Sequence, residues 1–125
     1  MASLQSLTEV IVKFRDERDW AQFHTPKNLA AAISIEAAEL QETMLWKNQE
    51  EIEELVKSPS ALARIGEEIA DVCIYGILLA HSLGIDLERA IESKIAQNAQ
   101  RYPVELARGN SKKHSELFKM HSEAD

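Results

Sequence analysis

Two pairs of carboxylates are the residues of this sequence whose type and spacing could do chemistry. Glu36 and Glu39 stand in a Glu-Ala-Ala-Glu segment, and Glu68 and Asp71 stand in a Glu-Ile-Ala-Asp segment. Residues three apart share one face of a helix, so each segment presents two acids together. Apolar residues one turn away align with both pairs, which predicts that the acids lie on or beside the buried stripes of two helices.

Acids in such a position need a positive partner, because an unpaired charge that leaves water costs several kcal/mol. The faces that carry them hold too few basic residues to pair all four. A divalent cation would resolve the conflict, and all-oxygen ligands favour Mg²⁺ or Mn²⁺ over zinc. The alternative at this point is that the four acids are solvated at the edge of the stripe.

Other chemistries have less support in the sequence. Di-iron bundles use Glu-x-x-His pairs, and no histidine here follows a glutamate by three residues. A Gly-rich phosphate loop is absent, and no Ser-His-Asp or Cys-His arrangement is legible. A hard-metal site is therefore the favoured chemistry.

Several residues outside the acid pairs could contact a ligand. Lys94, Asn98 and Arg101 recur at successive turns of one expected helix face, where they could meet phosphates and a base or sugar. Trp20 and Trp46 lie at the ends of expected helices, where an indole could stack on a base. Ordinary surface polarity for the first three, and core packing for the two indoles, stay open as alternatives.

The elements that must position these residues are all helical. Apolar periodicity predicts four main helices over about 5–21, 29–46, 60–83 and 87–102, and a short solvated helix within 47–57. Ser6 with Glu9 predicts a capping box, and Thr25 or Asn28 is expected to cap the second helix. Strand-like alternation is not found, so the predicted fold class is an all-α bundle.

The third main helix carries a prediction about assembly. Residues 72–80 are apolar on every side, which a lone four-helix monomer could not easily hide, so we expect burial against another subunit. Cys73 lies in this stretch and is expected to be a buried, inert thiol. Residues 1–110 are predicted to form one domain, and the polar residues 111–125 a flexible tail without a packed helix.

Composition limits the partners. The 125 residues include 21 acidic and 14 basic ones, a formal net charge of −7, which disfavours long nucleic acid as a ligand. The N-terminus lacks the pattern of a signal peptide, and the uncharged stretch 72–85 is too short to span a membrane. We therefore expect a soluble, cytoplasmic protein without membrane partners.

Beyond the two acid pairs, longer motifs carry a family resemblance. The sequence resembles the MazG-like all-α nucleotide pyrophosphohydrolases, and within them the dCTP pyrophosphatase branch, over about residues 14–117. The motifs are Glu17-Arg18-Asp19-Trp20, Gln22-Phe23-His24, Pro26, Asn28, Trp46-Lys47, Tyr75, Lys94, Asn98, Arg101-Tyr102-Pro103-Val104 and Arg108-Gly109. Aromatic residues that flank the tail lysine in the family are replaced here by Lys112 and His114.

The resemblance implies a reaction and a set of roles. Glu36, Glu39, Glu68 and Asp71 would hold Mg²⁺, with Mn²⁺ as a substitute, and water would attack the α-phosphorus of a deoxynucleoside triphosphate to give the monophosphate and pyrophosphate. Glu36 or Glu39 would orient the water. The implied substrate ligands are Trp20 and Trp46 flanking the base, Asn98 on the nucleotide, Lys94, Arg101, Tyr102 and Lys113 on the triphosphate, and His24 and Tyr75 as further candidates.

The resemblance also implies a homo-oligomer, a dimer or a tetramer, whose sites are lined by more than one subunit. The expected substrate is dCTP or a related dNTP, which fits a house-cleaning hydrolase of the nucleotide pool. Two alternatives remain: hydrolysis of another nucleotide, such as dUTP or phosphoribosyl-ATP, and a non-catalytic helical interaction module.

Overall fold

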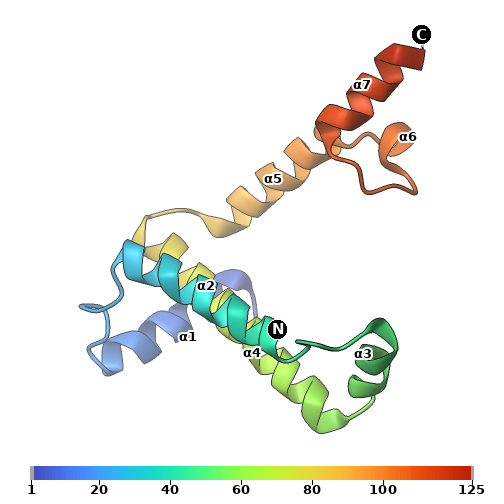
Figure 1. Cartoon of the computed structure of the whole chain (residues 1–125). Helices are drawn as coiled ribbons and strands as arrows, with labels where there is room; N and C mark the ends of the chain where they lie inside the picture. Colours follow the sequence, from blue (N-terminus) through green and yellow to red (C-terminus); the bar gives the residue numbers. More distant parts are fainter. Residues whose placement is uncertain (1, 125) are drawn as a thin grey trace. The chain divides into compact units, whose positions relative to one another are not determined.

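The structure is a computed structural model, and it describes residues 2–124, excepting the side chains of 120, 121, 123 and 124. Every regular element in this range is a helix, which confirms the predicted all-α class (Figure 1). The helices are α1 (Leu4–Glu17), α2 (Pro26–Glu42), α3 (Gln49–Leu55), α4 (Pro59–Ser82), α5 (Leu87–Arg101), α6 (Val104–Ala107) and α7 (His114–Ala124).

The chain forms two compact units, which are described separately. The first ends at Asp86 and holds α1 to α4, and the second begins at Leu87 and holds α5 to α7. In the first unit α2 and α4 lie side by side in opposite directions, and α1 packs against α4 (Figure 1). No helix within the described part of the chain is by itself long and apolar enough to cross a membrane.

The first helix is shorter than its periodicity suggested. Its capping box joins Ser3 to Ser6, whose hydroxyl accepts from the Ser3 amide at 2.8 Å, so the predicted box of Ser6 with Glu9 is wrong. The helix ends at Glu17 instead of extending to about 21. Asp19 adopts a left-handed backbone conformation with φ of 53°, which an α-helix cannot continue through.

The second helix also ends before its predicted limit. Thr25 caps it by accepting from the Asn28 amide at 3.3 Å, and Pro26 occupies the first turn, which confirms one of the two expected caps. The helix ends at Glu42, whereas a limit near Trp46 was predicted. Trp46 lies beyond it with φ of 64°, a conformation uncommon for a large side chain.

The remaining predicted helices agree with the structure. Asn48 caps α3 in a capping box with Glu51, and Ser58 caps α4 ahead of Pro59. Both α4 and α5 match their predicted ranges to within about a residue. Gly84, with φ of 68°, provides the left-handed turn after α4.

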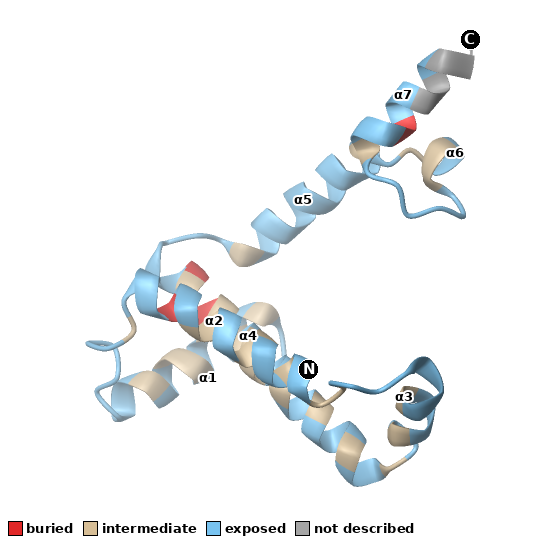
Figure 2. Ribbon diagram, viewed as in Figure 1, coloured by how far each residue is buried: buried red, intermediate tan, exposed pale blue. Residues whose placement is uncertain are grey.

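The core of the first unit is small and lies between α2 and α4. Its buried side chains are those of Leu29, Ile77, Leu78 and Ala80, which gather toward one end of the helix pair (Figure 2). Cys73, expected to be buried, is exposed instead. It lies on the same face of α4 as Leu62 and Ile69, which are also exposed, because offsets of seven and four residues return to one helix face.

The second unit contains a helix that was not expected. The polar segment after residue 110 was predicted to lack a packed helix, but α7 forms there and packs on α6, with Leu117 buried. The ring of His114 meets the ring of Tyr102 edge-on at 5.9 Å. Leu117 and the ring of His114 therefore connect the first turn of α7 to the rest of the second unit. Residue 125 lies outside the described range.

Candidate functional site

The antiparallel packing of α2 and α4 brings the two acid pairs together. One carboxylate oxygen each from Glu36, Glu39 and Glu68 lies within 4.8 Å of the others. Glu36 and Glu68 are half-buried, and Glu39 is exposed. Asp71 lies one turn after Glu68, and its charge acts on both half-buried acids. The structure thus brings three of the four predicted acids within 4.8 Å of one another, with Asp71 close enough for its charge to act on two of them.

The half-buried acids are poorly accommodated as free anions. The Oε2 atoms of Glu36 and Glu68 are buried, and neither has a hydrogen-bond partner within the described residues. Loss of water raises the pKa of Glu36 from 4.5 to about 7, and the closeness of Glu39 and the charges of Glu39, Asp71 and Glu68 add to the rise. Burial raises the pKa of Glu68 as well, with the charge of Glu39 as the next cause. The influences that raise the two pKa values therefore outweigh the positive charge near the cluster.

A divalent cation fits this arrangement. One oxygen from each of the three carboxylates lies within 4.8 Å of the other two, so one ion could be shared by all three side chains. Glu36 and Glu68 also each have a buried oxygen without a partner among the described residues. The donors are all hard oxygens, the type that Mg²⁺ and Mn²⁺ prefer. A bound cation would favour the charged carboxylates and so oppose the burial and the mutual repulsion that raise the two pKa values.

A cavity of about 390 Å³ is lined in part by Asp71, and its volume is within the size range of small-molecule sites. Its walls come from α1, the α1–α2 loop and α4. They are formed by Val10, Ile11, Phe14, Arg15, Trp20, His24, Asp71, Ile74, Tyr75 and Leu78. Asp71 therefore belongs both to the acid cluster and to a largely apolar cavity.

Four aromatic rings form a connected series along the cavity. The Trp20 ring meets Phe14 edge-on at 5.8 Å and lies 6.2 Å from His24, whose ring meets Tyr75 edge-on at 6.3 Å. The Nδ1 atom of His24 is buried without a hydrogen-bond partner in the described chain. Asn28 holds the loop by donating to the Phe23 carbonyl at 3.1 Å. The predicted Trp20, His24 and Tyr75 are thus brought together.

Trp46 does not join them. Its side chain is 92% exposed and does not line the cavity. Trp20 and His24 precede the start of α2, whereas Trp46 follows its end, and the 17 residues of α2 span about 25 Å. In this structure the two indoles therefore do not line the same cavity.

The other predicted ligands lie in the second unit. Lys94 and Asn98 are exposed on α5, where Lys94 donates to the Gln97 side chain at 3.0 Å, and Arg101 is half-buried at the end of this helix. Tyr102 follows α5 and contacts His114, and Lys113 directly precedes α7.

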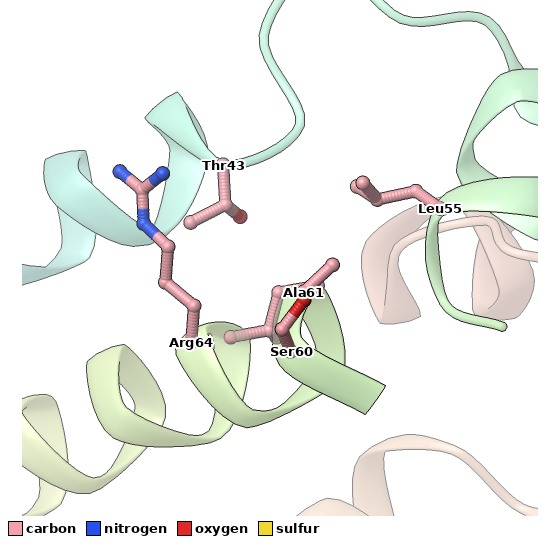
Figure 3. A pocket seen from close by; sticks show the side chains of 6 residues that line it. Thr43, Leu55, Ser60, Ala61 and Arg64 are labelled. Carbon is pink, nitrogen blue, oxygen red and sulfur yellow. The ribbon is translucent and has the colours of Figure 1, made fainter. Parts of the chain in front are cut away.

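Sequence reasoning missed two arginines. Arg64 precedes Glu68 by one turn, and its charge lowers the pKa of Glu68 against the other influences. Its side chain extends beside Thr43 in a second cavity of about 330 Å³, opposite Leu55 of α3 (Figure 3). The i, i+4 spacing could have revealed it. Arg15, on the wall of the aromatic cavity, has no motif that could have drawn attention to it.

Comparisons with known proteins agree with this geometry. The MazG-like family model matches residues 31–117, which hold all four acids. Residues of this chain are 41% identical to dCTP pyrophosphatase 1 of Rattus norvegicus over 115 residues, 92% of this chain and 68% of the relative. The human dCTP pyrophosphatase 1 is also 41% identical, with the same coverage.

A solved structure is similar over most of the fold. The crystal structure of a pyrophosphatase from Archaeoglobus fulgidus superposes with a TM-score of 0.74 at 38% identity, covering 82% of this chain and 94% of that one. Sequence, helical architecture and the acid cluster thus lead to one assignment. The chain belongs to the MazG-like family.

Proposed function

We propose that this protein is a Mg²⁺-dependent nucleoside triphosphate pyrophosphohydrolase that cleaves dCTP or a closely related dNTP to the monophosphate and pyrophosphate. The observation that carries the proposal is the three-carboxylate cluster, joined through Asp71 to an aromatic cavity large enough for a base. The dCTP pyrophosphatases among the relatives and the pyrophosphatase of similar structure support the same reaction.

Glu36, Glu39, Glu68 and Asp71 would hold the ion, with Mn²⁺ as a possible substitute. A bound Mg²⁺ supplies Lewis acidity toward phosphate oxygens and lowers the pKa of coordinated water. In the reaction, the water oxygen adds to the α-phosphorus, the bond to the bridging oxygen of the β-phosphate breaks, and pyrophosphate leaves. Glu36 or Glu39 would orient the water and accept its proton, because both carboxylates belong to the cluster and neighbour its other acids.

The cavity walls would hold the base. Trp20 and Tyr75 supply aromatic surface for stacking, and His24 supplies a buried nitrogen without a partner. We assign Trp46 to the same base, supplied by a second subunit, because its exposed indole lies beyond the far end of α2. We assign Asn98 to the nucleotide and Lys94, Arg101, Tyr102 and Lys113 to the triphosphate, whose negative charge needs cationic partners.

A homo-oligomer, dimer or tetramer, is part of this proposal. Leu62, Ile69 and Cys73 leave an apolar stripe of α4 exposed, and Ile35 does the same on α2. Burying such surfaces between subunits is favourable by roughly 25 cal/mol per Å². We place the protein in the cytoplasm, where an accessible thiol stays reduced.

The test is pyrophosphate release from the four dNTPs and four NTPs, each with Mg²⁺ or with chelator, and with the nucleotide products separated by chromatography. Metal-dependent formation of dCMP and pyrophosphate from dCTP, faster than from the other nucleotides, is expected. If no nucleotide is cleaved, the catalytic proposal fails and a non-catalytic interaction module becomes the better reading of the fold.

A further inference from the structure

Arg15 is a charged residue in an unusual place. It lies in the last turn of α1. Its side chain lines the aromatic cavity, as do those of Phe14 and Trp20. Its side chain is only 15% exposed, whereas Lys13 on the same helix is 77% exposed. An arginine seldom leaves water to this extent unless its guanidinium has partners.

Asp16 satisfies only part of the guanidinium. Its Oδ1 atom accepts from Arg15 Nε at 2.9 Å and lies 2.8 Å from Nη2. A guanidinium carries five N–H groups, so these contacts engage its inner edge. No further hydrogen bond from the Arg15 side chain occurs within the described residues, which leaves the outer edge, formed by Nη1 and Nη2, with donors to offer. Asp16 at the same time fixes the plane of the guanidinium.

We propose that Arg15 is a specificity-determining residue, which recognises in this cavity a base with two adjacent hydrogen-bond acceptors. The inference rests on the proposed function, because it assumes that the cavity receives the base of the nucleotide. Cytosine presents such a pair at O2 and N3. A planar guanidinium donates two parallel hydrogen bonds to a matched pair of acceptors, which an ammonium cannot do.

The same geometry rejects uracil and thymine. In these bases N3 carries a hydrogen, so a donor would face a donor where cytosine offers an acceptor. A site built to hydrogen-bond one base discriminates strongly against a base that leaves its polar groups unpaired. Guanine also has an adjacent acceptor pair, at O6 and N7. Arg15 would therefore separate cytosine from uracil and thymine, and would not by itself separate it from guanine.

Arg15 sits where such recognition is feasible. Trp20 lies five residues further along, and its amide donates to the Arg15 carbonyl at 3.1 Å, so the indole and the arginine are tied to one turn of backbone. A base stacked on Trp20 would present its edge to groups of the same wall. Asp71, on α4, connects this wall to the acid cluster.

The test is binding of dCMP and dUMP to the full chain by calorimetry, without metal, for the wild type and for Arg15→Met, Arg15→Lys and Lys13→Met. The wild type is expected to prefer dCMP by roughly 5- to 150-fold, the range for a good bidentate contact to a base. Arg15→Met should lose this preference, and Arg15→Lys should not restore it, whereas Lys13→Met should keep it. Circular dichroism identifies any variant that does not fold, and Arg15→Lys then carries the test.

The outcomes separate this inference from the proposed function. Equal binding of dCMP and dUMP by the wild type, or an unchanged preference in both Arg15 variants, would overturn the role of Arg15. Pyrophosphate release is measured in parallel. If the wild type prefers dCMP but cleaves no dNTP, the hydrolase proposal fails while the role of Arg15 stands; if it cleaves dNTPs without preferring dCMP, the reverse holds.

Discussion

Replacing Glu36 with glutamine should stabilise the metal-free protein at about pH 8. The Glu36 carboxylate has a buried oxygen without a partner and faces Glu39, Glu68 and Asp71. A neutral amide of nearly the same shape removes one negative charge from this cluster, and its NH₂ group can donate to a neighbouring carboxylate. A substitution that removes a proposed functional group would thus increase stability.

The magnitude follows from the pKa. A rise from 4.5 to about 7 corresponds to roughly 3 kcal/mol, at about 1.36 kcal/mol per pH unit. Water screens the charges around this half-buried group, so we expect about 1–2 kcal/mol. The folded state holds the proton more tightly than the unfolded chain, so wild-type stability falls as pH rises from 4.5 to about 7. The advantage of the glutamine variant should therefore be full above pH 7 and vanish near pH 4.5.

Urea unfolding of the wild type and Glu36→Gln, with chelator and at several pH values, measures this difference. The experiment is then repeated with Mg²⁺, which should stabilise the wild type by about 2.7 kcal/mol at a concentration 100 times its Kd, and the variant by less. If the metal-free variant is no more stable than the wild type at about pH 8, or if its advantage does not decrease on acidification, the cluster is not destabilised by unpaired negative charge.

Three further predictions concern activity. Glu68→Gln should reduce turnover to the level of the metal-free reaction and keep the helical circular dichroism spectrum. The control Glu67→Gln, which changes an exposed neighbour, should retain wild-type turnover. Equal rates for the two variants would remove Glu68 from the metal site. Trp20→Ala should weaken binding of dCMP by roughly 5- to 150-fold, since stacking of a base on an aromatic side chain contributes about 1–3 kcal/mol, and calorimetry that finds unchanged affinity would place the base elsewhere. Glu68→Gln and Trp46→Ala should each have low activity alone, and mixing the two proteins should restore turnover if the indole acts across a subunit interface. One site of the mixed oligomer then has intact acids from one chain and an intact indole from the other. A mixture no more active than its components would place Trp46 and the acids of one chain in the same site, or Trp46 outside it.

The parts of the fold that local signals determine were predictable. Ser58 followed by Pro59 defines the start of α4 through a hydroxyl cap and a first-turn proline, and Gly84 defines its end. The spacing of Glu36 with Glu39, and of Glu68 with Asp71, placed each pair on one helix face. That the two faces meet required the antiparallel packing of α2 on α4, which spacing within one helix cannot reveal.

The wrong predictions arose where a local sequence pattern does not determine which other part of the structure the segment packs against. The apolar periodicity of the sequence identified the stretch around Cys73, but it could not show which faces of the helix the same chain covers. The face that carries Cys73 is exposed in the structure. The limit of α2 was placed near Trp46 because nothing in residues 43–46 forbids a helix, yet the backbone turns left-handed there. The helix α7 went unnoticed because its burial depends largely on Leu117.

The positions of the two indoles bear on why a protein of this size would assemble. Trp20 and His24 lie before α2, the acids lie along its middle and on α4, and Trp46 lies beyond its end. Trp46 does not line the cavity that Trp20 and His24 line, and α2, about 25 Å long, separates them in the chain. We propose that another copy supplies the second indole to the base, and the exposed stripe of Leu62, Ile69 and Cys73 offers a surface on which that copy could pack. Assembly would then serve catalysis directly, because each subunit would contribute the acids of one site and the indole of the next.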